Sequence, residues 1–167
     1  MGKTQQERFR DLLRDFDTAV LITHEGNGLL RARPMAIAAV DENCDLWFIT
    51  GRDSAKAHEI ERNTSVHVVC QNGWTSCVSL RGRASIDNDP VKIHGLWKSS
   101  YQVWFPLGVN DPEIGLIHVV GEQGEYWDNT GLKRLTYVYQ AVKAIVTGRT
   151  PEVREGEQHG HVELARD

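Results

Sequence analysis

The sequence predicts an α+β fold, in which an antiparallel barrel of six or seven strands carries flanking helices. Five short strand-like segments precede residue 90, and turn residues separate them. Residues 78–87 alternate apolar or small side chains with polar ones, the period of a half-buried strand. Helical patterns occur only at the ends of the chain and in two crossings. A doubly wound parallel sheet would need a helix between most strands, so we expect consecutive hairpins that close into a small barrel.

Length and composition indicate one domain. The chain has 167 residues, of which 40% are hydrophobic and 25% charged. We expect a folded domain over residues 1–148 and a polar C-terminal tail over residues 149–167, because apolar periodicity is lost after Gly148. The net charge of −4 argues against general binders of nucleic acids or membrane surfaces. No apolar run reaches the roughly 20 residues of a membrane span, and three cysteines, an odd number, suit a reducing cytoplasm.

The first elements are a helix and three strands. Thr4 and Glu7 form a capping-box pattern that begins a helix. The apolar stripe of this helix recurs at helical spacing: Phe9, Leu12, Leu13 and Phe16. The strands are expected at residues 19–23, 29–40 and 46–50. Pro34 removes one donor from the second strand, which predicts an edge position or a bulge there.

The remaining elements alternate in type. They are expected, in chain order, as a helix over 54–63, strands over 66–70 and 74–87, a helix over 90–100, and a strand over 114–120 that 124–127 continues as a hairpin. Asn129 caps a final helix. Its apolar face carries Leu132, Leu135, Tyr139, Val142 and Val146.

A candidate phosphate site follows the third strand. Thr50 ends that strand, and a glycine turn leads to Ser54 and Lys56 at the start of a helix. Hydroxyls, backbone N–H groups and a lysine charge that converge at a helix N-terminus form a suitable anion site. Arg31 and Arg33 share one face of the preceding strand. The alternative is that Ser54 or Asp53 only caps the helix and that Lys56 is solvated.

Two further features have open interpretations. Trp104 and Phe105 precede Pro106, and this rigid apolar loop suits either a wall for a flat aromatic ligand or a plug for one end of the barrel. His159 and His161 lie two residues apart in the polar tail, where a solvated pair is the simpler interpretation than a metal site. Walker A, GxGxxG and GxSxG patterns do not occur.

Residues 48–60 resemble the phosphate-binding segment of pyridoxamine 5'-phosphate oxidases, and residues 33–36 resemble the strand before it. The Trp-Phe-Pro-x-Gly loop at 104–108 and the segment 125–128 are similar to the general stress protein branch of that superfamily. The resemblance covers roughly residues 5–147. It implies an FMN-binding split β-barrel and an intertwined homodimer with two FMN sites at its interface.

The resemblance also implies site residues. Arg33 matches the arginine that reaches the FMN phosphate, and the strand from Pro34 and Met35 onward would run beside the flavin ring. The phosphate segment would contribute Ile49, Thr50, Ser54 and Lys56, and the aromatic loop Trp104 and Phe105. The chain departs from the oxidases at Ala55, where they carry an arginine, and at Cys77, where they carry a glutamine near the ring.

The expected function is therefore that of an FMN-binding stress-type flavoprotein, an oxidoreductase for a small substrate of unknown identity. The alternatives are a flavin-binding or redox-sensing protein without turnover, and a superfamily member that binds FAD, deazaflavin or haem. A true pyridoxamine 5'-phosphate oxidase is not expected. The oxidases carry an Arg-x-His pair in a C-terminal extension; residues 149–161 contain no such pair, and three glutamates there would repel a phosphorylated substrate.

Overall fold

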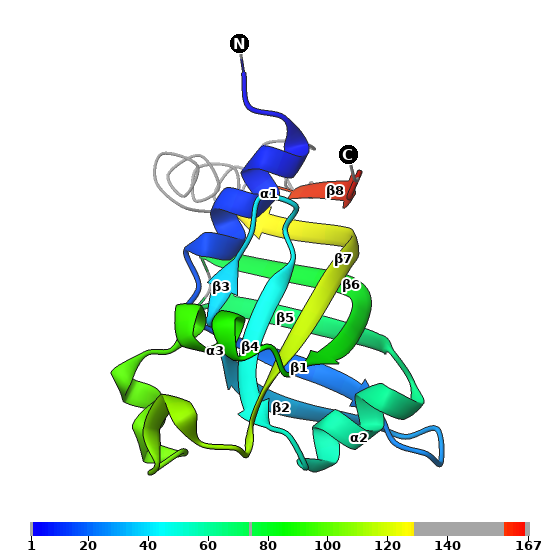
Figure 1. Ribbon diagram of the computed structural model, residues 1–167. Coiled ribbons are helices and arrows are strands. Elements are labelled where there is room, and N and C mark those ends of the chain that lie inside the picture. The colour runs from blue at the N-terminus through cyan, green and yellow to red at the C-terminus, as the bar shows by residue number, and fades with distance from the viewer. Residues whose placement is uncertain (1, 74, 129–158, 166–167) are drawn as a thin grey trace, which may run out of the picture.

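A curled antiparallel sheet forms the body of the protein. The computed structural model describes residues 2–73, 75–128 and 159–165. Within these ranges the strand order is β2-β1-β5-β6-β7-β4-β3, and β8 pairs with β7 beside this path. The three α-helices of the described ranges flank the sheet, with α1 at one end of the barrel and α2 at the other (Figure 1). The predicted α+β antiparallel barrel is confirmed: in the described ranges seven strands form the main path, as expected, and β8 adds an eighth.

The helices and strands have the following bounds. The N-terminal half contains α1 (Gln5–Arg14), β1 (Thr18–His24), β2 (Leu30–Ala36), β3 (Ala39–Val40), β4 (Leu46–Gly51), α2 (Ala55–Arg62) and β5 (Ser65–Asn72). The C-terminal half contains β6 (Ser76–Asp87), α3 (Pro90–Leu96), the short 3-10 helices η1 (Ser99–Val103) and η2 (Gly108–Asn110), β7 (Ile114–Asp128) and β8 (His159–Glu163). None of the helices in the described ranges is long and apolar enough to cross a bilayer.

The single strand predicted over 29–40 is wrong, because the chain changes partner within it. Residues 30–36 pair with β1, with Pro34 on the free edge as expected. The N–H of Ile37 then donates to the carbonyl of Asp17, whereas the next N–H, of Ala38, donates to the carbonyl of Trp47 on β4. Residues 37–38 thus carry the chain from one edge of the curled sheet to the other.

The hairpin predicted between 114–120 and 124–127 is also wrong. These residues form one long strand, β7, that pairs with β6 along its length. The register shifts between Arg81 and Gly82, so that β7 carries one extra residue there. A side chain at Gly82 would clash with the Val120 carbonyl oxygen. The irregularity is therefore a β-bulge, at which the two backbones approach closely. The sequence pattern of such a bulge resembles that of a turn, which is why a hairpin was predicted.

The end of the chain differs from the polar tail expected over 149–167. Residues 159–163 form β8, which pairs antiparallel with β7. Val162 is buried in the main core and Leu164 continues the same apolar face. Alternating burial over so few residues, next to glycine and histidine, is a weak signal in the sequence. The helix expected from Asn129 lies outside the described residues.

The helix predicted over 90–100 is shorter in the structure. It ends at Leu96, and the chain continues through η1 and η2. This segment covers the outer face of β4 and β7, where it forms a second apolar cluster with Ile49, Ile114 and Leu116. The main core lies inside the barrel. Successive residues of β4 therefore serve both clusters, since Phe48 points inward and Ile49 outward.

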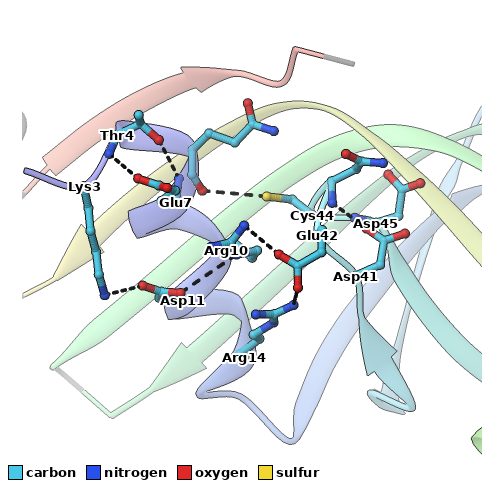
Figure 2. A network of polar contacts seen from close by, with 12 residues as sticks. Lys3, Thr4, Glu7, Arg10, Asp11, Arg14, Asp41, Glu42, Cys44 and Asp45 are labelled. Atoms are coloured by element: carbon cyan, nitrogen blue, oxygen red, sulfur yellow. Dashed lines mark hydrogen bonds and ion pairs between the residues drawn. The ribbon is translucent and has the colours of Figure 1, made fainter. Parts of the chain in front are cut away.

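Helix α1 closes one end of the barrel. The predicted capping box is confirmed, because the Thr4 hydroxyl accepts from the N–H of Glu7 and the Glu7 carboxylate accepts from the N–H of Thr4. Figure 2 shows how Glu42, in the turn before β4, bridges Arg10 and Arg14 at 2.8 and 2.7 Å. Helix α2 and the segment after α3 lie at the opposite end of the barrel (Figure 1).

Candidate functional site

A cavity of about 570 Å³ lies where β2, the C-terminal end of β4, the start of α2 and η1 meet. Its lining residues come from these elements, from the first residue of β1 and from the residues after η1. They are Thr18, Pro34, Met35, Ala36, Ile49, Thr50, Gly51, Lys56, Tyr101, Trp104 and Phe105. The volume lies within the range of about 300–1,000 Å³ that is usual for small-molecule sites.

Lys56 is the cation of this cavity. It lies in the first turn of α2 and is half-buried. Among the described residues no carboxylate forms an ion pair with its ammonium group. Desolvation by burial, followed by the positive charge of Arg33, lowers the pKa of Lys56 below its usual value. A half-buried ammonium beside a second cation is a poor structural group but a good site for an anion.

Arg33 lies just outside the cavity lining, where Glu59 of α2 holds its guanidinium. The distance from Arg33 Nη2 to Glu59 Oε1 is 2.9 Å, and Arg33 Nη1 donates to the Thr23 hydroxyl at 2.8 Å. The same hydroxyl donates to the other carboxylate oxygen at 2.6 Å. Arg31 contacts Glu59 at a longer distance, 3.4 Å from Nη1 to Oε1. It forms a closer ion pair with Glu25, at 2.6 Å. Arg31 and Arg33, the two arginines of β2, are thus both ion-paired with carboxylates of this chain.

The hydroxyls of Thr50 and Ser54 lie next to each other at the end of β4. Their oxygens are 3.2 Å apart. The Ser54 hydroxyl also accepts from the N–H of Ala57, which makes Ser54 the N-cap of α2. The capping role foreseen as an alternative is therefore real. The companion expectation of a solvated Lys56 is not met, because that side chain is half-buried in the cavity wall.

Aromatic side chains form another part of the cavity lining. Tyr101 and Phe105 are buried in the outer apolar cluster, whereas Trp104 is 78% exposed. The Trp97 ring packs against both buried rings, with centroid distances of 5.9 Å to Tyr101 and 6.4 Å to Phe105. The Trp97 ring thus holds Tyr101 and Phe105 in place, whereas Trp104 is exposed to solvent.

Seven of the residues predicted from the sequence line the cavity together: Pro34, Met35, Ile49, Thr50, Lys56, Trp104 and Phe105. Arg33 and Ser54 do not line it; Arg33 pairs with Glu59, and the Ser54 hydroxyl lies next to that of Thr50. Cys77 does not line it; it lies on β6, opposite Gln71 of β5 and Trp127 of β7. Thr18 and Tyr101 were not predicted as site residues. Thr18 lines the cavity because the pairing of β1 with β2 places it opposite Ala36, and no local sequence pattern reveals this register. Tyr101 could have been predicted, because it belongs to the aromatic segment before Pro106.

A second polar cluster lies away from the cavity. Asp45 is buried and holds His118 at 3.0 Å, and its other oxygen accepts from the N–H of Gly121. Asp41 accepts from two backbone N–H groups of the same turn (Figure 2). The His118 ring stacks on Trp47.

The two histidines near the C-terminus lie on β8. His159 stacks on Trp127, and His161 contacts Glu125 and Glu163.

Comparison with known families gives the identity of the fold. The model of the family described as "Pyridoxamine 5'-phosphate oxidase like" matches residues 4–152. The chain belongs to this family. The resemblance read from the phosphate segment and the aromatic loop is thereby confirmed.

One protein sequence and two solved structures are moderately similar to this chain. General stress protein 26 of Bacillus subtilis (strain 168) is 30% identical over 77 residues, which are 44% of this chain and 54% of that protein. The match thus spans about half the length of that relative. The structure of general stress protein 26 from Bacillus anthracis str. Sterne is 26% identical, with a TM-score of 0.65, and the match covers 72% of this chain and 92% of that one. The general stress FMN/FAD binding protein from Xanthomonas citri is 25% identical, with a TM-score of 0.63, over 76% and 90% of the two chains.

Proposed function

We propose that this protein binds FMN in the cavity between β2, β4, α2 and η1, as a stress-type flavoprotein. The observation that carries the proposal is Lys56, a half-buried lysine at the helix N-terminus that lines this cavity, with which no carboxylate of the described residues forms an ion pair. A phosphate would satisfy this charge. The Xanthomonas citri relative, whose name describes FMN or FAD binding, supports the same ligand class.

The rest of the cavity suits the other parts of FMN. Pro34 to Ala36 offer an extended backbone with small or flexible side chains, along which a flat ring system can lie. Trp104 and Phe105 offer aromatic faces for stacking. Thr50 and Ser54 add hydroxyls near the lysine. The residues present therefore fit a molecule with an anionic end and a planar end.

We further propose that any reaction belongs to the flavin. Among the described lining residues the ionisable groups are Lys56 and Tyr101, and none is a carboxylate, an imidazole or a thiol. Bound flavin supplies hydride or electron transfer. The protein would position the ring, exclude water from one face and select a small substrate, as an FMN-dependent oxidoreductase. The same lack of an acid–base group favours a second candidate, a flavin-binding or redox-sensing protein without turnover.

A second copy of the chain is proposed to complete the site. Several lining residues are exposed, and Trp104 is joined by Val103 at 80% and Leu107 at 74% exposure. Apolar side chains gathered beside a ligand cavity are typical of interfaces. A homodimer with flavin at its interface would cover them.

We expect the protein to act in the cytoplasm. Cys44 and Cys70 are buried, and desolvation raises the pKa of Cys44 to about 11 and that of Cys70 to about 12. Such thiols stay protonated and unreactive, as packing groups in a reducing compartment do.

The test is direct. The purified protein is stripped of ligands and titrated with FMN, FAD, a deazaflavin and haem, and binding is followed by visible absorption and flavin fluorescence. We expect FMN to bind with the highest affinity. Reduction of the complex by NADH or NADPH, followed by reoxidation, then separates an oxidoreductase from a protein without turnover. If no flavin binds at micromolar concentration, the proposal is wrong; preference for deazaflavin or haem would replace FMN by that group.

A further inference from the structure

Three side chains of metal-binding types lie together outside the cavity that Lys56 lines. They are Asp41 and Asp45, in the turn between β3 and β4, and His118 of β7. One ligand atom of each lies within 4.8 Å of those of the other two, and none of the three residues lines the cavity. Figure 2 shows Asp41 and Asp45 in this turn. The fold therefore brings two carboxylates and one imidazole from distant segments to one point.

Backbone groups orient the two carboxylates. Oδ1 of Asp41 accepts from the N–H groups of Asn43 and Asp45, at 2.8 and 3.0 Å. Oδ1 of Asp45 accepts from the N–H of Gly121 at 3.1 Å. Asp45 is 3% exposed, whereas Asp41 is partly exposed. Outer hydrogen bonds of this kind fix the direction of a ligating carboxylate, and they are typical of metal sites.

The imidazole is oriented as well. The His118 ring stacks on Trp47, with the ring centroids 3.9 Å apart and the planes at 9°. Its Nε2 lies 3.0 Å from Oδ2 of Asp45. Zinc bonds to nitrogen and oxygen of about 2.0–2.2 Å place neighbouring ligand atoms roughly 3.0–3.5 Å apart, so this pair already has a suitable spacing. His118 is partly exposed, which gives an ion access from solvent.

We propose that Asp41, Asp45 and His118 bind one divalent transition-metal ion of the zinc class. The imidazole decides the class, because Mg²⁺ and Ca²⁺ prefer oxygen ligands alone. The ion takes the position of the proton between His118 and Asp45, and water completes its coordination. It joins the turn before β4 to β7, so its role is to stabilise this part of the fold. The inference does not depend on the proposed FMN binding.

Two conservative variants test the site. His118→Gln removes the imidazole and keeps an amide that can bond to Asp45. Asp41→Asn removes one charge and keeps an oxygen that accepts the N–H groups of the turn. The untagged protein is freed of metal with a chelator and titrated by calorimetry with Zn²⁺, and with Mg²⁺ and Ca²⁺ for comparison. The melting temperature of each protein is measured with and without Zn²⁺.

The histidines of β8 supply the matched control. His161 also lies beside carboxylates, those of Glu125 and Glu163, so His161→Gln tests whether any histidine among acidic groups would bind the ion. Trp47 supplies a second readout, because it stacks on His118. Ni²⁺ is a paramagnetic ion of the same class and quenches the fluorescence of an indole that lies close to it.

We expect the wild type to bind one Zn²⁺ per chain and to melt at a higher temperature with the ion present. His118→Gln and Asp41→Asn should each weaken binding at least about 10- to 100-fold, the loss that even outer partners of a metal ligand cause. His161→Gln should bind as the wild type does. Ni²⁺ should quench the wild type, and Trp47→Phe should lose most of this quenching while it keeps the affinity for Zn²⁺.

Four results would overturn the inference. The first is a wild type that binds no Zn²⁺ at micromolar concentration, and the second is unchanged affinity in either His118→Gln or Asp41→Asn. Loss of binding in His161→Gln would place the ion at β8 instead. Tighter binding of Mg²⁺ or Ca²⁺ than of Zn²⁺ would exclude a site that the imidazole defines.

Discussion

Glu59 Oε1 lies 2.9 Å from Nη2 of Arg33, and this contact joins α2 to the edge strand β2 beside the cavity. Burial alone would raise the pKa of Glu59, but the hydrogen bonds from Arg33 and Thr23 outweigh it and hold the pKa below its usual value. The carboxylate is thus charged in the fold, and it forms its ion pair with the Arg33 guanidinium rather than with Lys56.

The first prediction concerns stability and pH. Because the pKa of Glu59 is lower in the folded protein, its contribution to stability is fully present above its pKa in the unfolded chain, near 4.5. This contribution is lost as the pH falls through the lower pKa of the folded state. Glu59→Gln should therefore reduce the free energy of unfolding by about 1.5–3 kcal/mol at neutral pH. The difference from the wild type should shrink at acidic pH. Denaturant unfolding across this range measures it; a loss that is independent of pH would contradict the charged pair.

The second prediction concerns Lys56. Lys56→Ala should weaken FMN binding by roughly 10- to 150-fold, because one charge-assisted phosphate contact contributes about 1.5–3 kcal/mol. Riboflavin should bind both proteins equally. Lys92→Ala is the control, because Lys92 pairs with Asp87 and does not line the cavity. Unchanged FMN affinity in Lys56→Ala would mean that the phosphate binds elsewhere and that Ser54 serves only as a helix cap.

The third prediction concerns assembly. Sedimentation equilibrium should show a dimer at micromolar concentration, with an interface of over about 2,000 Å² if it is obligate. Leu107→Asp should shift the protein towards monomer without lowering the melting temperature of the monomer, because Leu107 is 74% exposed. A monomeric wild type would remove the proposed second copy from the site.

The fourth prediction concerns β8. Val162→Ala should cost about 1–3 kcal/mol, because Val162 is buried against the main core. Glu163→Ala, on the exposed face of the same strand, should change stability by less than about 0.5 kcal/mol. Equal effects of the two substitutions in urea unfolding would indicate that the strand does not pack as described.

The fifth prediction concerns the reaction that gives the family its name. We expect no oxidation of pyridoxamine 5'-phosphate above the rate of free FMN, because residues 149–161 lack an Arg-x-His pair and carry three glutamates. Formation of pyridoxal 5'-phosphate is measured at several protein concentrations, with Lys56→Ala as the negative control. A rate that rises with protein and disappears in the variant would restore the oxidase interpretation.

The sequence by itself determined the parts of this protein that depend on neighbours along the chain. The capping box of Thr4 and Glu7 located α1, and the alternation over 78–87 located β6. The glycine turn between Thr50 and Ser54 located the start of α2. Caps, periods and turns act over a few residues, so their signals are complete in the sequence.

Only the tertiary structure decided which distant groups meet. The switch of partner at residues 37–38, the pairing of β8 with β7 and the entry of Thr18 into the cavity all depend on strand register. The contact between Arg33 and Glu59 joins residues 26 positions apart. Register and ion pairing are selected by the packing of the whole barrel, because a slip of one residue would turn each side chain to the other face.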